Sequence, residues 1–125
     1  VVGCECDFYQ YFLNRKDTSV EMVCSAMTTF KYLKKRYPQK IRRRKGRHVL
    51  KGAGWHFSNM GGYEKHLAKL RSFSHFREVD PDSVDPEFNF VKNYKLVEID
   101  QSFPKYIQEN IDYYKENNFI DKRSL

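Results

Sequence analysis

Apolar and aromatic residues recur along this chain in short segments, some with the period of a strand and some with that of a helix. Residues 8–13, FYQYFL, are aromatic and extended in character, which predicts a strand, and residues 14–17 indicate the turn that follows it. Residues 20–23 fit a second short strand. The basic residues 41–50 predict a hairpin or strand pair that turns at Lys45-Gly46.

Three segments have apolar residues spaced for one face of a helix: residues 25–36, 59–73 and 103–116. Pro38 ends the first helix, Ser58 or Asn59 can cap the second, and Pro104 can open the third. Residues 78–88 predict a loop that is too polar to bury. Short strands with two or three flanking helices therefore predict one mixed α/β unit over residues 1–125.

Positive charge is concentrated in one segment. The chain has 23 Lys and Arg against 16 Asp and Glu, a net charge of +7. Residues 31–51 contain eleven cationic side chains and no acidic one, so the rest of the chain is net acidic. Such a segment either attracts phosphate groups or is a solvated basic face. We expect Arg42, Arg43, Arg44 and Lys45 to be exposed, and any polyanion binding there to be weak and sensitive to salt.

The three cysteines, Cys4, Cys6 and Cys24, do not form a zinc framework, which needs four nitrogen or sulfur ligands in paired spacings. Their odd number allows one disulfide and one free thiol, or three reduced thiols that pack as small apolar groups. The number of cysteines therefore does not distinguish an oxidising from a reducing compartment. The apolar runs are too short for a membrane-spanning segment, and no signal sequence opens the chain.

The most specific feature of the sequence is the string GWHFSNMGG at residues 54–62, which is followed by KLRSFSH at residues 69–75. Further matching residues are FYQYFLN at 8–14, Ile99-Asp100, Pro104-Lys105-Tyr106 and Asn110. Together these segments resemble the C-terminal part of glycosyltransferase family 17. That family includes the β-1,4-mannosyl-glycoprotein N-acetylglucosaminyltransferase. The resemblance covers most of the chain.

The resemblance implies a GT-A-like fold and transfer of N-acetylglucosamine, or a related sugar, from a UDP-sugar donor to a glycan acceptor. It also implies a divalent metal, Mn or Mg, in the full-length enzyme. The family's acidic DEIP motif has no counterpart here, because residues 4–7, CECD, lack its spacing. The chain also opens without an initiator Met. We therefore expect residues 1–125 to be the C-terminal portion of a glycosyltransferase domain whose nucleotide-binding half precedes Val1, and the chain alone to lack catalysis.

The candidate substrate-binding residues are Trp55, His56, Ser58, Asn59, Gly61 and Gly62. An indole ring can stack on a sugar face, glycines allow close backbone approach, and a helix start offers N–H donors to phosphate. His56 is also the candidate metal ligand. The sequence distinguishes no catalytic base among the acidic residues of the 78–87 loop. His48, His66 and His75 are interpreted as packing or surface residues.

The alternative is a non-catalytic module that binds nucleic acid or another polyanion through residues 31–51. Against it, the sequence contains no RNP, KH or zinc-finger signature. Our leading interpretation has a nucleotide-sugar donor and a glycan acceptor as partners, and no nucleic acid. Relatives of bacterial or viral type would be cytoplasmic, whereas relatives of animal type would lie in the Golgi lumen.

Overall fold

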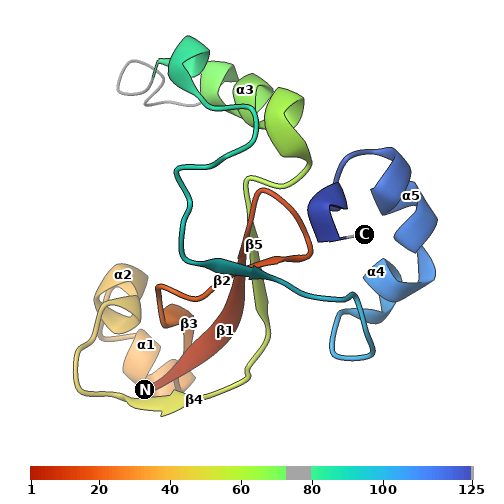
Figure 1. Cartoon of the computed structure of the whole chain (residues 1–125). Coiled ribbons are helices and arrows are strands. Elements are labelled where there is room, and N and C mark those ends of the chain that lie inside the picture. Colours follow the sequence, from red (N-terminus) through yellow and green to blue (C-terminus); the bar gives the residue numbers. More distant parts are fainter. Residues whose placement is uncertain (73–79, 125) are drawn as a thin grey trace. The chain divides into compact units, whose positions relative to one another are not determined.

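The computed structural model describes residues 1–72 and 80–124 as a mixed α/β chain. Six strands pair in one sheet in the order β3–β1–β2–β6, and β4 and β5 also pair with β1. Five α-helices are described, with two short 3₁₀ helices (Figure 1). The prediction of a mixed α/β fold of short strands and helices is therefore confirmed, although five α-helices are described where two or three were expected. The chain divides into two compact units, residues 1–8 with 20–56, and residues 9–19 with 57–125.

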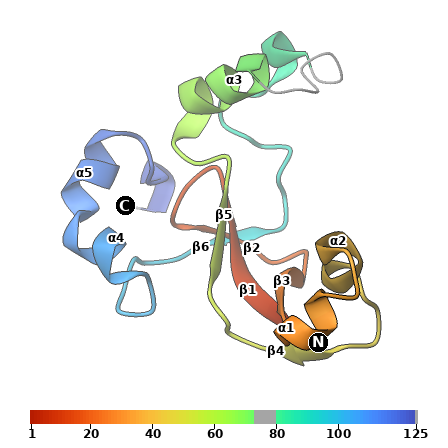
Figure 2. The ribbon, with the colours of Figure 1, turned by 180° about the vertical axis from the view of Figure 1, so that it is seen from behind.

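The first unit is built around the beginning of β1 (Val2–Gln10). Strand β3 (Met22–Met27) pairs antiparallel with β1, and β4 (His48–Leu50) pairs parallel with it. Helices α1 (Phe30–Leu33) and α2 (Pro38–Arg42) lie beside β3 (Figures 1 and 2). The buried Ile41 anchors α2, because it is the only residue of that helix that is withdrawn from water.

The second unit contains the end of β1, β2 (Arg15–Asp17) and β6 (Tyr94–Leu96), whose pairs are antiparallel. Its helices are α3 (Gly62–Ser72), α4 (Lys105–Glu109) and α5 (Ile111–Glu116), with 3₁₀ turns at Pro81–Ser83 and Lys122–Ser124. Strand β5 (Trp55–Ser58) begins in the first unit and ends in the second. The core of the second unit consists of Tyr9, Leu13, Phe103, Ile107 and Ile120.

The strand predicted over residues 8–13 ends earlier than expected. Strand β1 stops at Gln10, because Tyr11 takes a left-handed backbone conformation with φ of 66°. The predicted turn at 14–17 is mostly strand β2, whose Lys16 lies opposite Lys95 of β6. The turn itself therefore comes about three residues earlier than the sequence pattern indicated.

The helix predicted over residues 25–36 is largely wrong. Residues Met22–Met27 pair with β1 as a strand, and only Phe30–Leu33 are helical, after an N-cap at Thr29. Pro38 opens α2 where it was expected to end the preceding helix, since proline suits the first turn of a helix. The hairpin predicted over 41–50 is wrong too, because that segment holds the end of α2 and then β4.

The other two helices are confirmed with changed bounds. Helix α3 begins at Gly62, three residues after the predicted start, and residue 73 of that prediction lies outside the described residues. The helix predicted over 103–116 is divided into α4 and α5 at Asn110, whose φ of −120° interrupts the helical path.

Phe88, in the loop predicted to be too polar to bury, is fully buried. No described helix has both the length and the apolar character needed to cross a bilayer.

Candidate functional site

The first half of the GWHFSNMGG string lies on β5. Trp55 is 43% exposed, and the half-buried His56 packs its ring against Phe8 of the same unit, with 5.2 Å between ring centroids. An exposed tryptophan is the arrangement that stacking on a sugar face requires. The contact with Phe8 means that His56 also contributes to packing.

The second half of the string forms a tight corner that leads into α3. Asn59, Gly61 and Gly62 all have positive φ, at 56°, 97° and 75°. A side chain at Gly62 would also be crowded, since an added Cβ would lie 3.3 Å from the carbonyl oxygen of Asn118. The corner therefore favours glycine at both positions, because their backbone angles are strained for a residue with a side chain.

The N–H groups of Gly61 and Gly62 are not available to a phosphate, contrary to what the sequence led us to expect. Both donate to the carbonyl oxygen of Tyr11, at 3.1 and 3.3 Å. The expected capping by Ser58 or Asn59 is also wrong. The carbonyl of Ser58 accepts from the N–H of Tyr11, and the side chain of Asn59 accepts from Lys69 Nζ at 2.7 Å.

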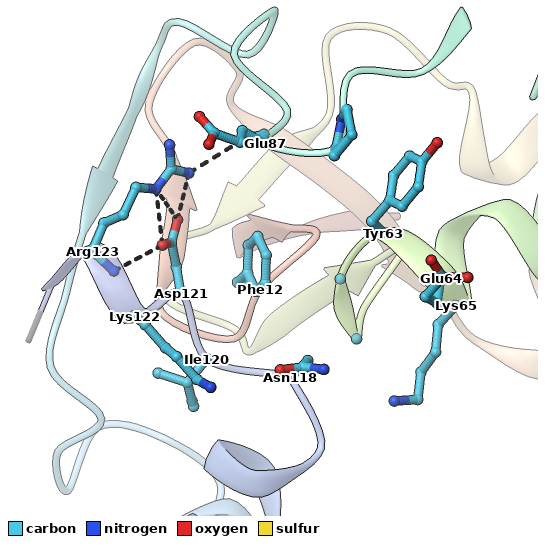
Figure 3. A pocket seen from close by; sticks show the side chains of 13 residues that line it. Phe12, Tyr63, Glu64, Lys65, Glu87, Asn118, Ile120, Asp121, Lys122 and Arg123 are labelled. Atoms are coloured by element: carbon cyan, nitrogen blue, oxygen red, sulfur yellow. Dashed lines mark hydrogen bonds and ion pairs between the residues drawn. The ribbon is translucent and has the colours of Figure 1, made fainter. Parts of the chain in front are cut away.

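A pocket of about 400 Å³ opens where α3 begins (Figure 3). Residues 61–65 line it together with Phe12, Pro86, Glu87 and residues 118 and 120–123. The first turn of α3 borders the pocket through Tyr63 and Glu64. All of these residues belong to the second unit, so the pocket is formed within it.

Charged groups of both signs line the pocket, and two of the cationic ones, Lys65 and Arg123, make hydrogen bonds within the chain. The Arg123 guanidinium donates to Asp121 Oδ2 at 2.7 Å and to the Glu87 carbonyl at 3.3 Å (Figure 3). Lys65 Nζ donates to the Asn117 carbonyl at 2.9 Å. Burial raises the pKa of Asp121, and the positive charge of Arg15 opposes that rise. The arrangement can hydrogen-bond a ligand that has both donor and acceptor groups.

The C-terminal wall of the pocket is fixed by a buried polar cluster around Asp121. Its N–H donates to Asn14 Oδ1 at 2.8 Å, and Asn14 Nδ2 returns a bond to the Asp121 carbonyl. Arg15, which is 1% exposed, donates to the Asp121 carboxylate at 2.9 Å and lies over the ring of Tyr94. The three hydrogen bonds to Asp121 join the C-terminal segment to β2 and to the residue before it.

An aromatic cluster supports the other side of the corner. The Tyr11 ring stacks on Phe88 with 4.1 Å between centroids, and the His66 ring meets both rings edge-on. Burial lowers the pKa of His66, as does the nearby Lys69, and burial raises the pKa of Tyr11. His66 is thus a packing residue of α3, as predicted. His48 is exposed on β4, and His75 lies outside the described residues.

Of the six predicted site residues, Gly61 and Gly62 line the pocket. Trp55 and His56 belong to the first compact unit. Ser58 and Asn59 belong to the second unit, where they accept hydrogen bonds from Tyr11 and Lys69 at the corner. Sequence reasoning missed Tyr63, Asp121 and Arg123 as pocket residues. The last two stand near the end of the chain with no motif around them, and only the fold brings them to the start of α3.

The basic segment is largely solvated. Among residues 31–51 every cationic side chain except Arg47 is exposed, including the four predicted to be so. Arg47 is half-buried and donates to the carbonyl groups of Ile41 and Arg42. The guanidinium groups of Arg36 and Arg44 lie over the ring of Tyr32.

Within residues 1–72 and 80–124, no three His, Cys, Asp or Glu side chains converge closely enough to hold a metal ion. His56 alone therefore does not make a metal site. Comparison with models of protein families, with curated proteins and with solved structures found no match to this chain.

Proposed function

We propose that this chain is the C-terminal part of a glycosyltransferase that moves N-acetylglucosamine, or a related sugar, from a UDP-sugar to a glycan acceptor. The observation that carries the proposal is the folding of the GWHFSNMGG string. It forms a strand, a glycine corner and a helix start, and the corner borders a pocket. The GT-A-like fold and the absent nucleotide-binding half belong to the same proposal, through the resemblance to family 17.

The charges of the pocket favour a sugar over a bare phosphate. Phosphate sites concentrate cations and N–H donors, but here Asp121 and Glu87 stand beside Lys65 and Arg123. A sugar ring presents hydroxyls that both donate and accept hydrogen bonds, so it suits this mixture. A volume of about 400 Å³ lies in the range of small-ligand sites. We therefore assign the pocket to a sugar ring of the donor or of the acceptor.

Trp55 and His56 belong to the first unit, and we propose a substrate contact for each of them by itself. The exposed face of the Trp55 indole offers an apolar surface to the C–H groups of a pyranose. His56 would contact a phosphate oxygen or the metal of the donor complex. Its imidazole would supply one nitrogen ligand, and any remaining ligands would come from outside the described residues, which do not complete a metal site around it.

The test is the substitution His56→Ala in the longest natural polypeptide that contains this chain. We expect turnover to fall about a hundredfold, the usual effect of losing one contact to charge that develops on a leaving group. The melting temperature should change little by comparison. His48→Ala is the matched control, because His48 is exposed on β4 and should affect neither quantity. Unchanged turnover with a collapsed melting temperature would identify His56 as a packing residue and remove it from the site.

One observation favours a second candidate, a polyanion-binding surface. Phe30 and Tyr37 expose 69% and 76% of their surface beside the exposed cations of residues 31–51, and bases of single-stranded nucleic acid stack on such rings. Fluorescence anisotropy with a labelled oligonucleotide tests it. Weak binding that disappears with added salt fits a basic face on a transferase. Tight, sequence-selective binding at physiological ionic strength would favour the binding module instead.

A further inference from the structure

Two of the three cysteine thiols are in direct contact in the first unit. Cys24 Sγ, on β3, lies 3.0 Å from Cys6 Sγ, on β1. The strands are antiparallel neighbours, and their register shifts between Cys4 and Glu5. Cys4 pairs with Ser25 and Glu5 with Val23, so Cys24 stands at the irregularity between two paired positions. A bulge of this kind re-aims a side chain, and here the side chain meets Cys6.

The third cysteine is placed differently. Cys4 is buried, and its carbonyl oxygen accepts a long contact from Cys6 Sγ at 3.9 Å. Cys6 and Cys24 are both half-buried, so a small oxidant can approach them. Within the described residues no third metal ligand accompanies the pair. The chemistry open to two thiols in this position is oxidation to a disulfide.

We propose that Cys6 and Cys24 form an intramolecular disulfide under oxidising conditions, which ties β1 to β3 and leaves Cys4 as a thiol. A disulfide needs its sulfur atoms at about 2.05 Å, so the two atoms have to approach by about 1 Å. Side-chain rotation supplies a movement of this size. The inference is independent of the proposed transferase activity, because it rests on the geometry of the sheet alone.

The bond forms by exchange with a small disulfide such as oxidised glutathione. One protein thiolate attacks a glutathione sulfur, which releases one glutathione thiolate and leaves a mixed disulfide. The second protein thiolate then attacks the protein sulfur of that mixed disulfide and releases the second glutathione. The two cysteines lose two protons and two electrons, and one glutathione disulfide becomes two thiols.

The surroundings of Cys6 influence the rate of this exchange. Burial and the hydrogen bond from Cys24 raise the pKa of Cys6 to about 11. The Cys6 thiol is therefore protonated at neutral pH, where it is a poor nucleophile. We expect the bridge to form slowly at pH 7 and faster as the pH rises.

The experiment is a titration of the purified chain in buffers of reduced and oxidised glutathione. Free thiols are then blocked with an alkylating reagent under denaturing conditions, and peptides are mapped by mass spectrometry without reduction. We expect one cross-linked species that joins Cys6 to Cys24, with Cys4 alkylated. The bridged chain should melt about 10 °C higher than the reduced chain, since a cross-link restricts the unfolded state.

Matched variants identify the bridge. Cys4→Ser should keep the cross-link, whereas Cys6→Ser and Cys24→Ser should each lose it. Cys4→Ser also preserves the test if either of the other variants folds poorly. Alkylation of all three cysteines in fully oxidised buffer would overturn the proposal. A bridge that includes Cys4, or one that joins two chains, would overturn it too.

Discussion

The substitution Gly62→Ala tests the corner that leads into α3. Gly62 has φ of +75°, where an alanine is strained by about 1–2 kcal/mol. Its added Cβ would lie 3.3 Å from the Asn118 carbonyl and 3.6 Å from the Phe12 ring. The first of these contacts is tight and involves backbone, so overpacking adds about 1 kcal/mol. We therefore expect the free energy of unfolding to fall by about 2–3 kcal/mol.

Urea denaturation followed by far-ultraviolet circular dichroism measures this change at a fixed temperature. Gly52→Ala is the matched control, because Gly52 has a similar φ of +62° but nothing within 4 Å of an added Cβ. Gly52→Ala introduces the backbone strain without the close contact. It should therefore lower the free energy of unfolding by about 1 kcal/mol less than Gly62→Ala does. If Gly62→Ala were as stable as the natural chain, the strain and the close contact assigned to this corner would be refuted, since an unstrained Gly-to-Ala change is neutral or stabilising.

Three further predictions concern other parts of the structure. Folding lowers the pKa of His66 from its ordinary value of 6.5. As the pH falls toward 6.5 and below, the unfolded chain therefore binds a proton at His66 more readily than the folded chain does. Stability should thus fall as pH drops from 7.5 to 5.5, by at most about 1.4 kcal/mol per pH unit, and urea curves of His66→Phe should lack this part of the fall. Asp121→Ala leaves the buried Arg15 charge without its carboxylate and should cost about 3–5 kcal/mol, whereas replacing both residues by apolar ones should cost less in the same assay. Trp55→Ala should weaken glycan binding in a titration and hardly change the melting temperature, because the indole is 43% exposed; a large loss of stability with unchanged binding would contradict its assignment.

The sequence predicted α3 because its signal is local. Apolar residues spaced for one helix face indicate a helix here, and α3 begins at Gly62, three residues after the predicted start. The break in β1 at Tyr11 could not be predicted in this way. Its left-handed backbone is supported by distant groups, namely the N–H groups of Gly61 and Gly62 and the stacked ring of Phe88.

Contacts between residues that are distant in the sequence also explain the wrong predictions in the first unit and the missed residues of the pocket. Residues 25–27 show helical spacing, but pairing with β1 decides their conformation. Asp121 becomes a pocket residue only through its bonds to Asn14 and Arg15, more than a hundred positions earlier in the chain. A local pattern cannot report such contacts. Sequence reasoning therefore found the glycine edge of the pocket and missed its charged wall.

The measurement that most directly tests the proposed transferase is made on the longest natural polypeptide that contains this chain. The protein is incubated with UDP-N-acetylglucosamine, Mn²⁺ and a panel of N-glycan acceptors, and released UDP and extended glycan are measured together. We predict acceptor-dependent UDP release and a glycan that is longer by one sugar, with both reduced about a hundredfold in His56→Ala. A protein that carries the upstream acidic motif, binds the donor and still extends no glycan would contradict the proposal.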